Sequence, residues 1–373
     1  MRSAEALHGE AVAATGLTDF GNNAYLEGLG VLLAATARAP DGVRNAVESN
    51  VIRLLIGRLH SQAGWSAHPA AMGNGIVRPV IITGLPRTGT TALHHLLSVD
   101  ERFQWLPHWI TATPKPRPPR SQWSDDDDYR RSLAALAERH KANPQARAAH
   151  NVEAGKAEEC LNVMAQSFTT MMFVSSVPAP DYHEWFLQAD EEPSYERYAD
   201  NLRLIALREP AKPWLLKNPS HTFGMASLLK VFPDARIVMT YRDPVESIPS
   251  GASLIKLSSV SGWDAESLGR HRLRIWSLAA QRAETQRRAD PERFFEADYR
   301  RIVGDPRSLV ADIYQWLGLE IDDALRGRID GWIDENPQGR HGDHHYTPEQ
   351  FGLSAPVIRA ELGDYVGRYG LAP

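Results

Sequence analysis

Residues 78–98 constrain the fold more strongly than any other stretch of this chain. Residues 80–82, Val-Ile-Ile, form a short apolar run of β-branched side chains that predicts a buried strand. Gly84 and Gly89 then bracket a tight turn, and an amphipathic segment with helical spacing begins at Thr90. A strand, a glycine-containing loop and a helix N-terminus together suit a phosphate-like anion, because loop N–H groups and the helix dipole place positive charge at one spot.

The loop nearly matches the P-loop pattern G-x-x-x-x-G-K-[ST] of proteins that bind nucleoside triphosphates. Gly84, Gly89 and Thr91 occupy their positions, but Thr90 stands where the pattern requires the lysine that contacts the β- and γ-phosphates. The cation inside the loop is instead Arg87. We therefore interpret the loop as an anion site that is poorly suited to Mg-ATP hydrolysis. An ordinary strand–turn–helix corner is the alternative.

Length and composition limit the classes of protein that fit. A chain of 373 residues can bury a large core, and we expect a helical N-terminal extension over residues 1–76 and an α/β domain over residues 77–373. The net charge of −5 argues against a nucleic-acid partner. A single cysteine, Cys160, excludes an intrachain disulfide, and no apolar run approaches the roughly 20 residues that span a bilayer. Because the N-terminus also lacks an apolar signal core, we expect a cytoplasmic protein without a transmembrane segment.

Two more apolar runs, residues 214–216 and 237–241, predict further strands. Because strand and helix patterns alternate, we expect a parallel sheet with right-handed crossovers. Ligands of such sheets bind at the carboxyl ends of the strands. Arg87, Lys217 and Arg242 each follow a different predicted strand, so these three cations should meet at one edge of the sheet.

The rest of the chain is predicted to be mainly helical. Helical periodicity covers residues 17–62, 154–174, 195–207, 221–232, 270–288, 309–317 and 355–365, and residues 294–299 predict one more strand. A helix should also begin at Pro244 with Asp243 as its N-cap. The proline-rich residues 107–119 exclude regular structure, and they form either a lid over the site or a surface connection.

Adjacent histidines do not predict a metal site. His94 and His95, like His344 and His345, are neighbours in sequence, and consecutive helical side chains point about 100° apart. Each pair is therefore a poor chelate. The acidic run at residues 125–128 is interpreted as a helix start stabilised by the helix dipole. We expect no metal in the site.

Four separated motifs resemble those of the sulfotransferases that use 3′-phosphoadenosine 5′-phosphosulfate (PAPS), especially their bacterial branch. Residues 85–91, LPRTGTT, are similar to the loop that binds the 5′-phosphosulfate. Residues 241–250, YRDPVESIPS, resemble the 3′-phosphate motif, and residues 299–306, YRRIVGDP, resemble the segment whose tyrosine lies near the adenine. Residues 339–353, which begin GRH and end FGL, resemble the C-terminal loop that closes over the nucleotide.

The resemblance implies a P-loop-like parallel sheet flanked by helices, and it assigns roles to individual residues. The donor-binding set is Arg87, Thr88, Gly89, Thr90 and Thr91 at the phosphosulfate, Arg242 and Ser250 at the 3′-phosphate, Tyr299 near the adenine, and Arg340 and His341 in the closing loop. Lys217 and Arg87 are expected to stabilise the departing phosphate oxygen during in-line transfer. PAPS would be the donor co-substrate and 3′-phosphoadenosine 5′-phosphate (PAP) the product, with no metal required.

The resemblance does not assign the general base. Many cytosolic members carry a base histidine two residues after the lysine, but Pro219 stands at that place here. The candidates are Glu159, Glu158 and His221. We prefer Glu159, because residues 157–160, AEEC, resemble the acidic helix start of the bacterial branch and of related glutamate-base enzymes.

We therefore expect an enzyme that transfers a sulfuryl group from PAPS to a hydroxyl of a small-molecule or lipid-like acceptor. A P-loop kinase or NTPase, and a non-catalytic nucleotide-binding protein of the same fold, are the alternatives. Seven apolar side chains either line an acceptor pocket or belong to the core: Trp105, Trp109, Phe168, Met171, Met172, Tyr182 and Trp185. Neither the acceptor nor the oligomeric state, for which a homodimer is one option, follows from the sequence.

Overall fold

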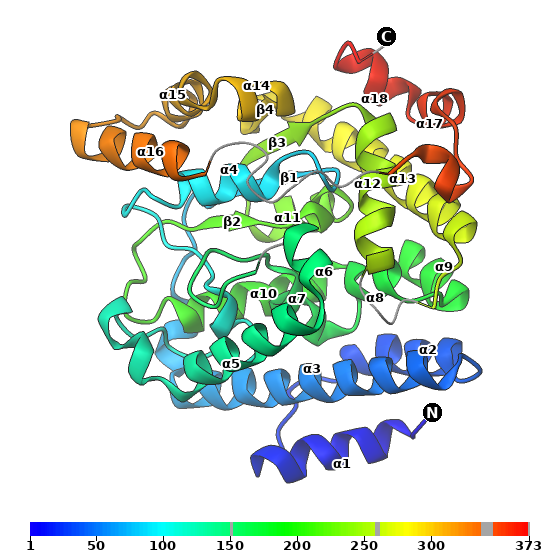
Figure 1. Ribbon diagram of the computed structural model, residues 1–373. Helices are drawn as coiled ribbons and strands as arrows, with labels where there is room; N and C mark the ends of the chain where they lie inside the picture. Colours follow the sequence, from blue (N-terminus) through cyan, green and yellow to red (C-terminus); the bar gives the residue numbers. More distant parts are fainter. Residues whose placement is uncertain (150–151, 258–261, 337–345, 372–373) are drawn as a thin grey trace.

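The computed structural model describes residues 1–149, 152–257, 262–336 and 346–371, and a four-stranded parallel sheet lies at the centre of this part of the chain (Figure 1). The strands are β1 (Val80–Gly84), β2 (Leu215–Lys217), β3 (Arg236–Tyr241) and β4 (Phe294–Asp298), in the order β2-β1-β3-β4. Val80 pairs with both Leu215 and Arg236, so β1 lies between β2 and β3. The predicted α/β class and the four predicted strands are confirmed.

Different helices cover the two faces of the sheet. Val80 and Ile82 pack on one face and Ile81 on the other, as the two-residue period of a strand requires. The first face is covered by α4 (Thr90–Leu97), α14 (Tyr299–Gly304), α15 (Pro306–Leu317) and α16 (Asp323–Glu335); the second by α10 (Glu192–Ile205), α11 (Met225–Val231) and α13 (Ala265–Ala289). Strand β1 is buried on both faces, and this explains why residues 80–82 are all apolar rather than alternating with polar residues.

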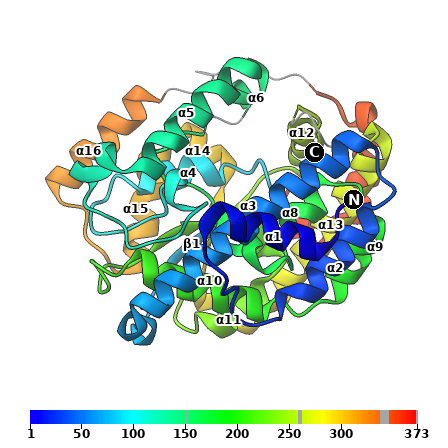
Figure 2. The same cartoon turned by 90° about the horizontal axis from the view of Figure 1, so that it is seen from below.

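Three helices form the N-terminal part of the chain and run beneath the rest of the molecule (Figures 1 and 2). They are α1 (Ala4–Thr15), α2 (Tyr25–Thr36) and α3 (Asp41–Ala67). Leu29 and Leu59 are fully buried in a core that they share with Phe168 from the middle of the chain. Helix α1 was not predicted, because only Leu7 and Ala11 of its side chains are buried and its apolar periodicity is weak.

In the part of the chain that the structure describes, eight further helices surround the sheet and the N-terminal helices. They are α5 (Asp127–Ala142), α6 (Pro144–Ala149), α7 (Leu161–Met164), α8 (Met171–Ser176), α9 (Pro180–Gln188), α12 (Pro244–Leu257), α17 (Ala355–Glu361) and α18 (Gly363–Arg368). Short 3₁₀ turns occur at Pro69–Gly73, His108–Ile110, Arg120–Asp125, Ala165–Ser167, Pro219–Thr222, Pro291–Arg293 and Pro348–Phe351. The predicted start at Pro244 is confirmed, since the Val245 N–H donates to the Asp243 carboxylate at 2.9 Å. Among the described residues, no helix combines the length and apolar character needed to cross a membrane.

The helix predicted over residues 154–174 is wrong. That stretch holds only the short helices α7 and α8 with a 3₁₀ turn between them, and Glu158 and Glu159 lie in an irregular segment ahead of α7. Tertiary hydrogen bonds compete successfully with the helix: the Glu158 N–H donates to the Leu106 carbonyl at 2.8 Å, and the Cys160 N–H donates to the Lys217 carbonyl at 3.0 Å. The predicted helix over residues 355–365 is likewise divided into α17 and α18.

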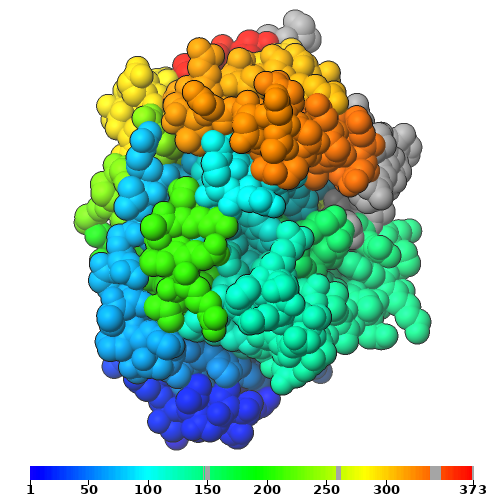
Figure 3. Space-filling view, turned by 90° about the vertical axis from the view of Figure 1, so that its left-hand side faces the viewer, coloured from blue at the N-terminus to red at the C-terminus, as the bar shows by residue number. Residues whose placement is uncertain are grey.

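A groove of about 1250 Å³ opens on the side of the molecule shown in Figure 3. Segments around residues 98–105, 117–123, 208–212 and 328–335 line it, and these are far apart in sequence. None of the residues of the loop between β1 and α4 belongs to its described lining. The groove is therefore separate from the anion site predicted at that loop.

Gly84 gives a direct test of how tightly the end of β1 is packed. Its φ of 142° is one that L side chains rarely adopt, and an added Cβ would overlap the carbonyl oxygen of Thr240 on β3. We expect Gly84→Ala to lower the free energy of unfolding by about 2–4 kcal/mol in urea denaturation, because neither backbone can yield. The control is Gly9→Ala in α1, where a Cβ meets open space; it should change stability by less than about 1 kcal/mol. Equal effects of the two substitutions would contradict this account of the strand end.

Candidate active site at the carboxyl edge of the sheet

The loop between β1 and α4 is shaped by internal contacts. Arg87 and Gly89 both have left-handed backbones, with φ of 69° and 90°. At Gly89 a Cβ would lie 2.9 Å from Ile302 and 3.1 Å from the ring of Tyr299, so the loop passes close to α14. The hydroxyl of Thr88 points inward, donating to the Leu85 carbonyl at 2.6 Å and bonding the Thr240 hydroxyl at 2.6 Å. These contacts fix the shape of the loop through the Thr88 hydroxyl and the close packing at Gly89.

The first turn of α4 follows this loop directly. Gly89 is the N-cap, and no side chain of the described residues caps the helix. The unpaired N–H groups and the positive end of the dipole therefore point toward the loop. Thr90 is 4 % exposed, whereas Thr91 is half-buried and carries its hydroxyl toward β2. This arrangement suits an anion held by backbone N–H groups.

The predicted meeting of Arg87, Lys217 and Arg242 is supported by the topology, because each follows or ends one of three adjacent parallel strands. Arg242 donates to the Arg87 carbonyl at 3.2 Å, and the Arg87 side chain donates to the Ser250 hydroxyl at 3.2 Å. Burial lowers the pKa of Arg87, and the positive charge of Arg242 lowers it further. Two neighbouring guanidinium groups of like charge favour a bound anion at this place.

The side chain of Arg242 is held in a fixed orientation. Its guanidinium carbon lies 4.2 Å from the ring centre of Tyr299, and its Nε donates to Glu246 at 2.9 Å. The Tyr365 hydroxyl accepts from the Arg242 backbone N–H at 3.2 Å. These contacts bring Arg87, Arg242, Ser250 and Tyr299 into one group.

A second group forms where β2 ends beside α4. Lys217 is 1 % exposed, and its ammonium donates to the Glu159 carboxylate at 2.7 Å and to the Thr91 hydroxyl at 3.1 Å. Glu159 is partly open, with 22 % of its side chain exposed. An almost fully buried ammonium needs a charged partner, and Glu159 provides it. The Lys217 charge therefore sits between the N-terminus of α4 and a carboxylate that solvent can reach.

Glu158 has different surroundings from its neighbour. Its Oε2 lies 3.1 Å from the His108 Nδ1, and its Oε1 accepts the Glu159 N–H at 2.7 Å. Both oxygens of Glu158 are thus occupied. The sequence does not predict the contact with His108, because the two residues lie 50 positions apart and no local pattern joins them.

His221 lies apart from these groups. Its side chain is completely buried, and its Nδ1 lies 3.0 Å from the Tyr195 hydroxyl. Burial lowers the pKa of His221 to about 3, so its ring is neutral. It packs against the rings of Tyr195 and Tyr198 on the α10 side of the sheet.

Other predicted residues are placed as follows. Arg340 and His341 lie outside the described residues. His94 and His95 each direct Nε2 at a backbone carbonyl, of Leu215 at 3.4 Å and of Ala157 at 2.9 Å. Of the seven apolar candidates for an acceptor pocket, four are buried core residues (Trp109, Phe168, Met171 and Tyr182), and three are only partly buried (Trp105, Met172 and Trp185).

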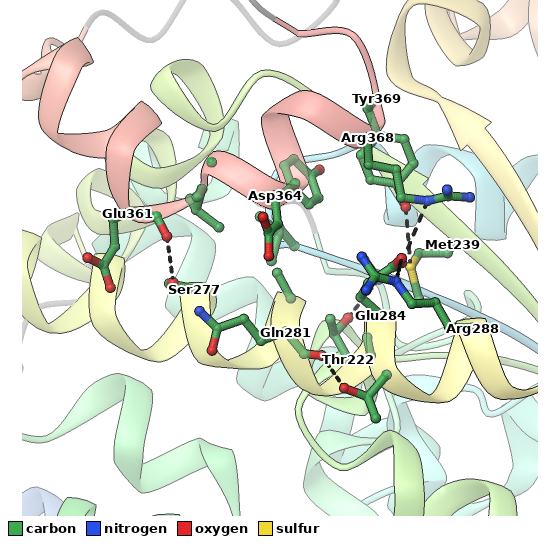
Figure 4. A pocket seen from close by; sticks show the side chains of 18 of the residues that line it. Thr222, Met239, Ser277, Gln281, Glu284, Arg288, Glu361, Asp364, Arg368 and Tyr369 are labelled. Carbon is green, nitrogen blue, oxygen red and sulfur yellow. Dashed lines mark hydrogen bonds and ion pairs between the residues drawn. The ribbon is translucent and has the colours of Figure 1, made fainter.

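A cavity of about 400 Å³ lies behind the loop, between α13 and the C-terminal helices. Figure 4 shows Gln281 and Glu284 of α13 on one side of it and Asp364 of α18 on the other. Gly84 belongs to its described lining, whereas Arg87 does not. The cavity therefore reaches the start of the loop at Gly84 and Leu85.

Comparisons with known proteins agree with this geometry. A model described as the sulfotransferase family matches residues 79–323, which include the loop, Lys217, Arg242 and Tyr299. The chain belongs to the sulfotransferase family. The crystal structure of sulfotransferase STF1 from Mycobacterium tuberculosis H37Rv superposes with a TM-score of 0.88 at 32 % identity, covering 97 % of this chain and 99 % of that one. Sulfotransferase STF9 from Mycobacterium avium gives a TM-score of 0.91 at 26 % identity, covering 99 % and 97 %.

A relative whose name states its activity has the same sequence identity as STF9. The omega-hydroxy-beta-dihydromenaquinone-9 sulfotransferase Stf3 of Mycobacterium bovis is 26 % identical over 323 residues, covering 78 % of this chain and 75 % of that protein. The predicted family and the predicted sulfotransferase activity are confirmed. The alternatives of a kinase, an NTPase or a non-catalytic protein are accordingly set aside.

Proposed function

We propose that this sulfotransferase uses PAPS as its donor and transfers the sulfuryl group to a hydroxyl of a lipid-like or other small acceptor. The observation that carries the donor assignment is the contact between Arg87 and Arg242, in which the Arg242 guanidinium donates to the Arg87 carbonyl. PAPS is anionic at its 5′-phosphosulfate and at its 3′-phosphate. A simple nucleoside triphosphate has no 3′-phosphate to occupy a second cationic site.

The two anionic ends of PAPS are assigned to different residues. We assign the phosphosulfate to Arg87 and to the N–H groups of Thr88, Gly89, Thr90 and Thr91, which include the uncapped start of α4. Because the Thr88 hydroxyl is engaged inside the loop, only its N–H serves this purpose.

We assign the 3′-phosphate to Arg242 and Ser250, whose hydroxyl already accepts from Arg87. Tyr299, which stacks under Arg242, is assigned to the adenine side. Arg340 and His341 are proposed to complete the nucleotide site. No metal is required in this scheme, because guanidinium, ammonium and N–H groups supply the positive charge.

Transfer requires one bond to form and one to break. The acceptor oxygen attacks the sulfur, and the bond from sulfur to the 5′-phosphate oxygen breaks. The 5′-phosphate of PAP then carries one more negative charge than it did in PAPS, while the sulfuryl group takes its own charge to the acceptor. Lys217 and Arg87 are proposed to stabilise that charge, since Lys217 is bonded to Thr91 at the edge of the loop. Positioning and electrostatics carry most of the rate enhancement in the related phosphoryl transfers.

The acceptor hydroxyl must also lose its proton. We propose Glu159 as the base, because its side chain is partly open to solvent and binds Lys217 through Oε1. We assign proton abstraction to the other carboxylate oxygen. Glu158 is less suitable, since His108 and the Glu159 N–H occupy both of its oxygens. His221 is unsuitable because its ring is completely buried.

The acceptor class is proposed from the relatives. Stf3 is named for a menaquinone carrying an omega-hydroxyl, and a hydroxyl on a lipid-like molecule is therefore the acceptor we favour. A cytoplasmic location, a homodimer and a boundary between residues 76 and 77 stay predictions of the sequence.

A transfer assay tests the proposed function. With labelled PAPS and a panel of hydroxylated isoprenoid quinones, sterols and phenols, we expect sulfated product from at least one lipid-like acceptor. Arg87→Ala should reduce the rate by at least about 100-fold, because it removes charge from the phosphosulfate site. The control is Arg38→Ala, an exposed arginine of the N-terminal part, which should keep full activity. Unchanged transfer by Arg87→Ala would refute the loop assignment.

Three substitutions distinguish the bases. We expect Glu159→Gln to lower turnover roughly 10²-fold or more while PAP affinity changes little, as loss of a general base does. Glu158→Gln and His221→Ala should each retain more turnover than Glu159→Gln. Glu153→Gln is the matched control, because Glu153 lies in the same segment with a 44 % exposed side chain. A selective loss in Glu158→Gln or His221→Ala would transfer the role to that residue.

A further inference from the structure

A cavity of about 520 Å³ lies between the N-terminal helices and helices α9 and α10, away from the donor loop. It reaches two arginines, Arg58 of α3 and Arg197 of α10, and the polar part of its lining includes Asn22, Tyr25, Ser167, Thr169, Gln188 and Ser194. None of the residues assigned to donor binding or catalysis lines it among the described residues. Its volume lies in the range of small-molecule sites.

Both arginines are buried. Arg58 is 1 % exposed and Arg197 is 7 % exposed. The Arg197 Nη2 donates to the Arg58 carbonyl at 3.1 Å, so the two residues are in direct contact. Burial lowers the pKa of Arg58 to about 10, and burial together with the charge of Arg58 lowers the pKa of Arg197. The pair is therefore a local excess of positive charge inside the molecule.

Among the described residues, the hydrogen-bond acceptors of these guanidinium groups are all neutral oxygens. Arg58 donates to the carbonyls of Phe20 at 2.6 Å, Asn22 at 2.7 Å and Gln166 at 3.2 Å. Arg197 Nε donates to the side-chain oxygen of Gln166 at 3.2 Å. Each group also faces an aromatic ring, with Arg58 at 4.0 Å from Tyr25 and Arg197 at 4.4 Å from Trp65. These contacts orient the guanidinium groups but contribute no negative charge.

No carboxylate of the described residues forms an ion pair with either arginine. Asp200, one turn from Arg197, is instead paired with Arg203 at 2.7 Å. The acids of this cavity are Glu27 and Asp190, and both are exposed at its rim. The negative charge of Asp19 acts on both arginines, and that of Asp200 acts on Arg197, but neither carboxylate forms a direct ion pair with them. Burying two like charges without a directly paired counter-ion is costly, and buried charges in proteins are ordinarily paired. A bound anion would remove that cost.

We propose that this cavity binds a small polar molecule through an oxyanion group, a carboxylate or a phosphate or sulfate ester, with Arg58 and Arg197 as its counter-ions. The oxyanion lies at the buried arginine end, where guanidinium groups match its geometry. The hydroxyl and amide side chains of the lining contact the rest of the molecule. The acidic rim disfavours polyanions, so a ligand with one anionic group fits best. This site is separate from the residues assigned to the donor.

The test is a titration of the full chain with inorganic sulfate, inorganic phosphate and acetate, each against sodium chloride of equal ionic strength. We expect at least one of the three oxyanions to raise the melting temperature and to give a measurable Kd by calorimetry. Sulfate or phosphate binding alone indicates an ester ligand, and acetate binding indicates a carboxylate. The experiment is repeated in Arg87→Ala, where the donor loop is impaired and the stabilisation should persist.

Matched substitutions in α10 then locate the site. Arg197→Gln should weaken oxyanion binding at least tenfold, whereas Arg203→Gln, which removes an ion-paired arginine of the same helix, should leave it within twofold. The alternative is that the arginines only bind backbone carbonyls. In that case no oxyanion raises the melting temperature of the wild type, or Arg197→Gln binds the oxyanion as tightly as Arg203→Gln does. Either result overturns the proposal. Should Arg197→Gln not fold, wild-type crystals soaked in selenate decide. A parallel soak in bromoacetate covers the carboxylate case. An anomalous peak beside the Arg197 guanidinium is expected in at least one of the two soaks, and its absence from both overturns the site.

Discussion

The parallel pairing of β1 with β2 and β3 determines where the charged groups of the active site lie. Because Val80 is in register with both Leu215 and Arg236, the three strands end at one edge, and the residues that follow them are brought together there. Arg87 and Arg242 meet through a backbone carbonyl, and Lys217 reaches Thr91 at the start of α4. A shift of one strand would separate these groups and expose side chains that are now buried.

Burial at this edge of the sheet couples Lys217 to a carboxylate. Lys217 is almost completely buried and depends on Glu159, so the residue proposed to stabilise the leaving group is electrostatically coupled to the proposed base. Taking a proton onto Glu159 would weaken its attraction for Lys217 and leave more of that positive charge for the departing phosphate. The ion pair thus links the two halves of the proposed reaction through one hydrogen bond.

The sequence predicted the sheet and its cationic edge well, because the strands are short apolar runs buried on both faces and the cations follow them directly. It failed at residues 154–174, where apolar spacing suggested a helix. There, hydrogen bonds from the Glu158 and Cys160 N–H groups to the carbonyls of Leu106 and Lys217 replace those of a continuous helix. The His108 contact with Glu158 and the Arg58–Arg197 pair were also not predictable, since each joins positions far apart in the chain and no local pattern marks them.

The central claim is that two cationic groups recognise the two anionic ends of PAPS. Calorimetric titration of PAP and of ATP with Mg²⁺ against the same protein tests it most directly. The account predicts that PAP binds at least about tenfold more tightly, because the 3′-phosphate gains charge-assisted hydrogen bonds from Arg242 and Ser250 that ATP cannot form. Equal or tighter binding of ATP with Mg²⁺ would contradict it.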